Sequence, residues 1–216
     1  PRSTLFPYTT LFRSKTIACL SGTGATIWAG TIGGEVKCID VTSDMDGDGI
    51  AECFVGGRDK FVYCFSGAGK NGGKFTLMGR FVSADVLSVI AIPSVNGDDM
   101  PDCVIGTANR TVEWREYPTG NELWKYTAQG NVACVALTDD INEDGFPDVV
   151  AGSEDNSVYA LDGNSGTLFW STALADDILS LMAFADVNQD GKMDIVAGTA
   201  DDKIVCLSGG GAQAGH

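Results

Sequence analysis

The chain has 216 residues, enough for one sizeable hydrophobic core, and carries 29 acidic residues against 14 lysines and arginines, a net charge of −15. No basic stripe is present, which argues against nucleic acid as a partner, because phosphate binding needs clustered cations. No apolar run approaches the roughly 18 residues that a membrane span requires, so we expect no transmembrane segment.

The first residues differ in character from the rest of the chain. Residues 4–14 resemble the in-frame translation of a sequencing-adapter oligonucleotide. We therefore interpret residues 1–14 as a non-native artefact and leave them out of the fold prediction. A genuine β-rich segment is the alternative. On the artefact interpretation the native start is missing, and the rest is a fragment of a longer reading frame.

From residue 16 onward, short β-rich runs of 5–7 residues alternate with turns rich in Gly, Asn and Asp, which predicts antiparallel strands. In chain order the runs are 16–22, one near Trp28, 36–41, 53–57, 61–67, one near Phe75, 86–92, 103–107, 111–116, one near Trp124, 132–138, 149–153, 157–163, one near Trp170, 178–184, 195–199 and 203–209. No segment shows a sustained 3.6-residue apolar period, so we expect almost no helix.

Four strands recur at intervals of about 46 residues, which is typical of an all-β fold, the β-propeller, built from four-stranded antiparallel blades. Residues 15–209 form this predicted repeat domain, and residues 210–216 a Gly-rich tail. The chain opens with the last two strands of one blade, holds three full blades and closes with three strands of another. About four blades result, either as an arc of a larger propeller, which we favour, or as a small ring. The recurring aromatic residue is expected to fill the wedge between neighbouring blades.

Four acidic loops lie between the fourth run of one repeat and the first run of the next, and their first residues are 50, 46 and 46 positions apart. Oxygen-bearing side chains stand at positions 1, 3, 5 and 9, a glycine stands at position 6 in three copies, and position 7 would add a carbonyl. This pattern predicts calcium. The candidate ligands are Asp44, Asp46, Asp48, Ile50 (carbonyl) and Glu52; Asn96, Asp98 and Asp102; Asp140, Asn142, Asp144, Phe146 (carbonyl) and Asp148; and Asp186, Asn188, Asp190, Lys192 (carbonyl) and Asp194.

Three of these loops are expected to bind calcium, and the second to be weak or empty. There Ser94 replaces the first carboxylate and Asp99 occupies the glycine position. Gly49, Gly145 and Gly191 are expected to adopt a positive φ. An EF-hand is excluded because it needs a glutamate at position 12, where this chain has valine or alanine. The alternatives are that Asp, Asn and Gly merely form turns, or that magnesium binds.

The loop pattern Asp-x-Asn-x-Asp-Gly-x-x-Asp followed by Val-Val-Ala-Gly resembles the FG-GAP repeat of integrin-α-type and VCBS-like propellers. The stretch 158–170, Val-Tyr-Ala-Leu-Asp-Gly-Asn-Ser-Gly-Thr-Leu-Phe-Trp, and the stretch 117–124 are similar to the repeat of pyrroloquinoline-quinone (PQQ) enzymes. Together these resemblances cover residues 16–209. They imply a propeller and calcium, and they leave activity open, because both repeats occur in proteins that are not enzymes.

Neither cysteine nor histidine suggests catalysis. Each of the seven cysteines aligns with a strand position that is small or apolar in other repeats, so we expect free buried thiols, with disulfides as the alternative. The only histidine, His216, ends the chain, which leaves no Ser-His-Asp arrangement and no catalytic residue to assign.

These features favour a calcium-binding propeller module that acts as a scaffold or recognises a protein or a carbohydrate, alongside the remaining blades of its parent chain. We expect an extracellular, periplasmic or cell-surface location, because millimolar calcium suits such sites; unpaired thiols weigh slightly against it. The alternative is part of an enzyme, either a PQQ-dependent dehydrogenase or a calcium-dependent polysaccharide-degrading propeller. The adjacent cysteine pair of the dehydrogenases is missing from this sequence.

Overall fold

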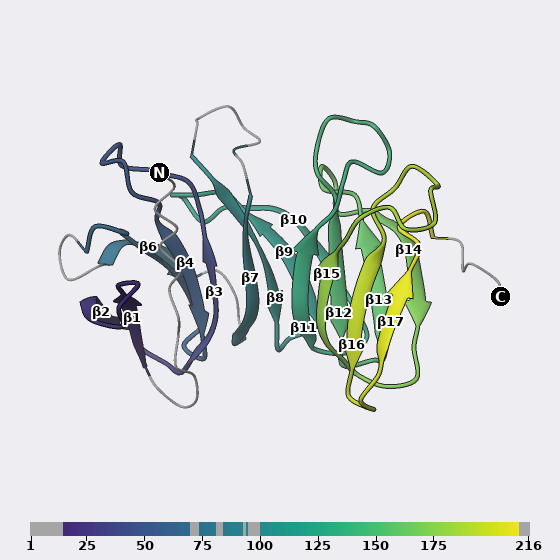
Figure 1. The fold of residues 1–216 in the computed structure, drawn as a ribbon, viewed down its shortest axis with the longest axis horizontal. Coiled ribbons are helices and arrows are strands. Elements are labelled where there is room, and N and C mark those ends of the chain that lie inside the picture. Colours follow the sequence, from purple (N-terminus) through teal and green to yellow (C-terminus); the bar gives the residue numbers. More distant parts are fainter. Residues whose placement is uncertain (1–14, 70–73, 81–83, 93, 95–99, 212–216) are drawn as a thin grey trace. The chain divides into compact units, whose positions relative to one another are not determined.

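The structure is a computed structural model that describes residues 15–69, 74–80, 84–92, 94 and 100–211. Residues 1–14, on which the artefact interpretation depends, and residues 212–216 of the predicted tail lie outside the described residues. The part of the chain that is described consists of strands and turns, with no helix, and so no helix that could span a membrane (Figure 1). The predicted all-β class is confirmed.

Within the described residues, seventeen strands form five sheets of two, four, four, four and three strands, in chain order. The sheets are β1 (Thr16–Leu20) and β2 (Thr26–Thr31); β3 (Val36–Val41), β4 (Cys53–Gly57), β5 (Phe61–Phe65) and β6 (Lys74–Arg80); β7 (Val86–Ile92), β8 (Asp102–Thr107), β9 (Thr111–Arg115) and β10 (Glu122–Thr127); β11 (Val132–Leu137), β12 (Val149–Ser153), β13 (Ser157–Leu161) and β14 (Leu168–Ala173); β15 (Ile178–Ala183), β16 (Ile195–Thr199) and β17 (Ile204–Leu207). This is the order and number of strands that the repeat predicts.

The chain divides into two compact units, residues 1–103 with 116–121 and residues 104–115 with 122–216. The first unit contains β1–β7, the second contains β9–β17, and the division falls within β8. Figure 1 shows the strands of the sheet β11–β14, and those of the sheet β15–β17, running side by side. In the second unit, apolar residues of these two sheets form one buried cluster that includes Val150, Val158, Ile178 and Ile195.

Close sheet packing requires a glycine near the end of β4 and near the end of β12. A Cβ added to Gly152 would lie 2.5 Å from Ile178 Cγ2, and one added to Gly56 would lie 2.5 Å from Val86 Cγ1. Real Cβ atoms do not approach so closely. Gly56 and Gly152 therefore each leave a notch that receives a β-branched side chain of the next sheet.

The recurring tryptophans link consecutive sheets through their indole N–H groups. Trp28 Nε1 donates to the carbonyl of Gly67 at 2.9 Å, Trp124 Nε1 to that of Gly163 at 2.7 Å, and Trp170 Nε1 to that of Gly209 at 2.9 Å; each partner follows the second strand of the next repeat. The predicted packing of these aromatic residues between blades is confirmed for the three tryptophans. The side chain of Phe75 lies outside the described part.

A tyrosine–aspartate pair, which the sequence analysis did not identify, fixes the connection into a sheet. Asp155 Oδ2 accepts hydrogen bonds from the N–H groups of Gln129 and Gly130, at 2.8 and 2.7 Å, and from the hydroxyl of Tyr159 at 2.9 Å. In the first unit, Asp59 and Tyr63 make the equivalent contacts. Sequence pattern alone presents these as ordinary turn and strand residues.

All seven cysteines are free thiols, as the repeat alignment predicts. Cys19, Cys53, Cys64 and Cys103 are buried, Cys38 and Cys134 are partly buried, and Cys206 is exposed, so the predicted full burial is confirmed for four of the seven. Burial is the main cause that raises the pKa of the Cys53 and Cys134 thiols to about 12. These thiols are therefore protonated and unreactive at neutral pH.

Candidate metal sites

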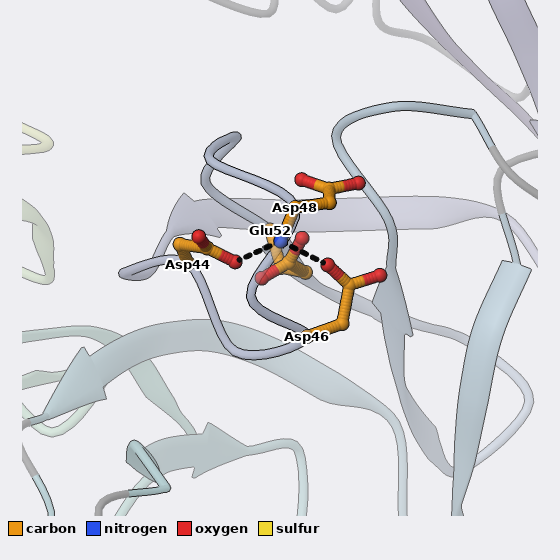
Figure 2. Close-up of side chains that lie close together, drawn as sticks. All are labelled: Asp44, Asp46, Asp48 and Glu52. Atoms are coloured by element: carbon orange, nitrogen blue, oxygen red, sulfur yellow. Dashed lines mark hydrogen bonds between the residues drawn. The ribbon is translucent and has the colours of Figure 1, made fainter.

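The first acidic loop joins β3 to β4 and gathers four carboxylates. Oxygens of Asp44, Asp46, Asp48 and Glu52 lie within 4.8 Å of one another, and Figure 2 shows the four side chains around one turn of the chain. Gly49 has a φ of 86°, as predicted, in a left-handed conformation that glycine adopts without strain. This geometry lets the chain reverse direction around the acidic side chains.

Backbone N–H groups hold these carboxylates in place. Asp44 Oδ2 accepts from Gly49 N at 2.7 Å, and Asp44 Oδ1 accepts from Gly47 N at 2.8 Å and Asp48 N at 3.2 Å. Asp46 Oδ1 also accepts from Asp48 N, at 3.1 Å (Figure 2). Asp48 Oδ1 accepts from Ile50 N at 2.9 Å. Three of these N–H groups converge on Asp44, and they orient the carboxylates without removing their charge.

Glu52, the ninth residue of the loop, is fully buried. Its Oε2 accepts from Met45 N at 2.5 Å, while Oε1 accepts no hydrogen bond. Burial is the largest cause that raises the pKa of Glu52, and the charges of Asp46 and Asp44 raise it further, against the N–H groups of Met45 and Gly67. A buried carboxylate oxygen without a donor, beside three more carboxylates, suits a hard divalent cation with oxygen ligands.

The third acidic loop joins β11 to β12 and repeats the same hydrogen bonds. Asp140 accepts from Asp144 N at 3.0 Å and Gly145 N at 2.7 Å, Asn142 Oδ1 accepts from Asp144 N at 3.2 Å, and Asp144 Oδ1 accepts from Phe146 N at 3.0 Å. Gly145 has a φ of 95°. Desolvation opposes the shift, but the N–H groups of Gly145 and Asp144, with the charge of Lys192, hold the pKa of Asp140 below its ordinary value.

The ninth residue of the third loop accepts backbone hydrogen bonds at both of its carboxylate oxygens. Asp148 is fully buried; its Oδ2 accepts from Ile141 N at 2.6 Å and its Oδ1 from Gly163 N at 2.8 Å. Burial raises the pKa of Asp148 to about 6, with smaller contributions of the same sign from the charges of Asp162 and Asp140. Asp148 therefore ties the loop to the end of β13, a structural role that does not depend on a cation.

The fourth acidic loop joins β15 to β16. Asp186 accepts from Asp190 N at 3.1 Å and Gly191 N at 2.9 Å. The hydroxyl of Ser208, 2.7 Å from Asp190 Oδ2, is the largest cause that lowers the pKa of Asp190, followed by the amide of Asn188.

The ninth residue of this loop, Asp194, is buried; its Oδ2 accepts from Val187 N at 2.8 Å, and its Oδ1 accepts no hydrogen bond. Asp194 therefore has one carboxylate oxygen that accepts a backbone N–H, as in Asp148, and one that accepts no hydrogen bond, as in Glu52.

The second loop is described only at its first residue, Ser94, and at residues 100–102. Asn96 and Asp98 lie outside the described residues, so the expectation of a weak or empty site there stays a prediction. Asp102 is fully buried and accepts from Tyr117 N at 3.0 Å. It thus takes the structural position that Asp148 takes in the third loop.

Among the acidic, histidine and cysteine side chains that are described, only the first loop brings three or more within 4.8 Å of one another. The third and fourth loops replace the acid at position 3 by Asn142 and Asn188. The carbonyl ligands assigned to Ile50, Phe146 and Lys192 stay predictions. The sequence analysis missed Asp162, whose Oδ2 accepts from Asn142 Nδ2 at 3.0 Å, because that residue lies in a turn 20 positions further along the chain.

Residues 140–197, which contain the third and fourth acidic loops, match the family model described as the FG-GAP-like repeat. This match confirms the resemblance to FG-GAP repeats over that part of the chain, whereas the similarity to PQQ repeats stays a prediction. No curated protein matches the chain in sequence.

Several solved structures share the fold. BBS1N, crystallised in complex with ARL6DN, has a TM-score of 0.66 at 11% identity over 89% of this chain and 58% of its own. The WD40 β-propeller domain of Doa1 has a TM-score of 0.66 at 17% identity over 90% and 58%. Saccharomyces cerevisiae Sqt1 has a TM-score of 0.70 at 13% identity over 90% and 53%. The chain spans a little over half the length of each, and its fold is that of a β-propeller.

Proposed function

We propose that this chain is a calcium-binding β-propeller repeat module that serves as a scaffold or as a recognition surface for a partner protein. The observation that carries the proposal is the set of four carboxylates, Asp44, Asp46, Asp48 and Glu52, whose oxygens lie within 4.8 Å of one another. Four negative charges at this spacing repel one another, and a divalent cation relieves that repulsion. The match to the FG-GAP-like repeat over residues 140–197 supports the same chemistry in two further loops.

The residues of the loop are arranged to hold such an ion before it arrives. Convergent N–H groups fix the orientation of Asp44 and Asp48, and Gly49 provides the reversal of the chain. Glu52 is buried and is held in place by the hydrogen bond from Met45 N. A bound calcium would supply positive charge and rigidity at the point where β3 passes into β4, so its effect is expected on stability rather than on a chemical reaction.

A protein partner is the recognition role that we propose. BBS1N, whose fold this chain shares, was crystallised in complex with ARL6DN. The location that we propose, extracellular, periplasmic or cell-surface, follows from calcium sites of modest affinity, which millimolar calcium would fill.

Calorimetric titration of calcium into the chelator-treated protein tests the binding. We expect calcium to bind to the parent chain, and Asp44→Asn with Asp48→Asn to remove the site in the first loop. Asp202→Asn, at an exposed turn outside the loops, removes one carboxylate charge by the same kind of substitution and should leave the titration unchanged. At calcium a hundredfold above Kd, a single site adds about 2.7 kcal/mol to the free energy of unfolding, which raises Tm by about 5–10 °C. Equal Tm values in calcium and in EDTA would refute the proposal.

A further inference from the structure

Two polar contacts join the fourth acidic loop to the third. Lys192 Nζ donates to the carbonyl of Ile141 at 2.8 Å, and Met193 N donates to Asp139 Oδ2 at 3.0 Å. Asp139 directly precedes the first candidate ligand of the third loop, Asp140, and Ile141 directly follows it. The contacts therefore attach the chain on both sides of that ligand, through the Asp139 side chain on one side and the Ile141 carbonyl on the other.

The donors of these contacts also belong to a candidate site. Lys192 and Met193 lie between Asp190 and Asp194, and the carbonyl of Lys192 is itself a predicted ligand of the fourth loop. In the first loop, Ile50 occupies the position of Lys192, and its side chain carries no hydrogen-bond donor. The third loop has Phe146 there. Among the three loops that keep the full ligand pattern, only the fourth can thus reach a neighbour through position 7.

We propose that the third and fourth acidic loops form a coupled pair, in which a divalent cation in the fourth loop raises the cation affinity of the third, while the first loop binds independently of both. The inference rests on the proposed function. A cation held by the carbonyl of Lys192 fixes the backbone from which the Lys192 side chain and the Met193 N–H extend to the third loop. The third loop then loses less conformational entropy when it binds its own cation. By linkage, a cation in the third loop raises the affinity of the fourth by the same factor.

Charge effects at Lys192 are separable from this coupling. The ammonium group disfavours a cation in either loop, but it is present in every binding state, so it changes absolute affinity and leaves the coupling unchanged. Repulsion between two bound divalent ions acts against the coupling. It is reduced because three carboxylates in each loop, Asp140, Asp144 and Asp148 in the third, compensate the charge of the ion.

The test is an NMR calcium titration of the full chain, read at the backbone amides of Gly145 in the third loop and Gly49 in the first. The fourth loop is disabled by Asp186→Asn with Asp190→Asn. We expect this change to raise the calcium midpoint at Gly145 about fivefold, the low end of typical couplings, and to leave the midpoint at Gly49 unchanged. Unaltered amide protection in β12 serves as the control for folding.

A second variant separates the contacts from general disturbance. Lys192→Met keeps most of the aliphatic stem and removes the donor, and Asp139→Ala removes the acceptor of the other contact. In this background, disabling the fourth loop should no longer move the Gly145 midpoint. The coupling is overturned if disabling the fourth loop in the parent chain leaves the Gly145 midpoint unchanged or lowers it. It is also overturned if disabling the fourth loop still moves that midpoint when the two contacts are absent. Calcium binding itself would stand in each of these cases. If no loop of the parent responds to calcium, the proposed function fails and the coupling fails with it.

Discussion

The first and third acidic loops share one pattern of nine residues but differ in how they limit charge repulsion. The first loop has carboxylates at all four ligand positions and no lysine or arginine between Asp44 and Glu52. The third replaces one carboxylate by Asn142, and its Asp140 lies under the influence of the Lys192 charge. The third loop should therefore be more stable without a cation than the first, and a bound cation should stabilise the first loop more.

The two loops also differ in the hydrogen bonds made by the ninth residue. In the third loop both oxygens of Asp148 accept backbone N–H groups, whereas in the first loop Glu52 Oε1 accepts none. One position of the pattern thus combines two roles, a structural tie and a candidate ligand. The balance between the two roles differs from loop to loop, although the residue type is acidic in both.

The largest effect is expected from removing the Asp148 carboxylate, which ties the third loop to the end of β13. Asp148→Ala deletes the acceptor of two charge-assisted hydrogen bonds and leaves the buried N–H groups of Ile141 and Gly163 without partners. We expect a loss of about 3 kcal/mol or more in the free energy of unfolding, measured by urea denaturation with and without calcium. Asp144→Ala in the same loop is the matched control and should cost far less without calcium. An equal loss for both would contradict the distinction between tie and ligand.

The pH dependence of the calcium-free protein is the next effect in size. The pKa of Asp148 is about 6 in the folded chain against an ordinary 3.8, so its stabilising contribution is complete below about pH 3.8 and is lost as the pH rises through about 6. Burial raises the pKa of Glu52 in the same direction. In EDTA, stability should therefore fall between pH 4.5 and pH 7. Asp148→Asn should flatten this slope, and a slope unchanged in that variant would exclude Asp148 as its source.

Converting the first loop towards the third is expected to have a smaller effect. Asp46→Asn introduces the amide that Asn142 and Asn188 already provide at this position. Without calcium the variant should be more stable by about 0.5 kcal/mol, because one repulsive charge is removed, and its calcium affinity at this loop should fall roughly tenfold. Thermal denaturation in EDTA and calorimetry measure the two quantities. A variant that is less stable in EDTA would show that repulsion in the empty loop is not significant.

The smallest effect concerns the fourth position of the loop. The first loop has Gly47 there, with a φ of 76°, whereas Glu143 and Gln189 adopt φ values of 62° and 63°. Gln189→Gly should stabilise the fourth loop by only about 0.3 kcal/mol, because the entropy that glycine loses on folding offsets most of the relieved left-handed strain. Denaturation in calcium would measure this gain. Gln129→Gly, at a turn outside the acidic loops, controls for the greater entropy of glycine in the unfolded chain.

The strand order was accessible from the sequence because the β-rich runs recur at intervals of about 46 residues. The Val-Ala-Gly motif that ends at Gly152 marks a strand, and the tryptophans mark the contact to the next sheet, whereas the notch at Gly152 appears only in the structure. The tie made by Asp148 was not accessible, since an acid before an apolar strand looks the same whether its oxygens face an ion or backbone N–H groups. The Lys192 contact was missed because it depends on which loops lie side by side.

The most direct test of calcium binding is a crystal structure of the chain grown with calcium, in which anomalous diffraction locates the ions. The account predicts an anomalous peak in the first acidic loop, about 2.3–2.6 Å from oxygens of Asp44, Asp46 and Asp48, with further peaks in the third and fourth loops. A first loop that contains no peak at millimolar calcium, with its carboxylates turned away from one another, would contradict it.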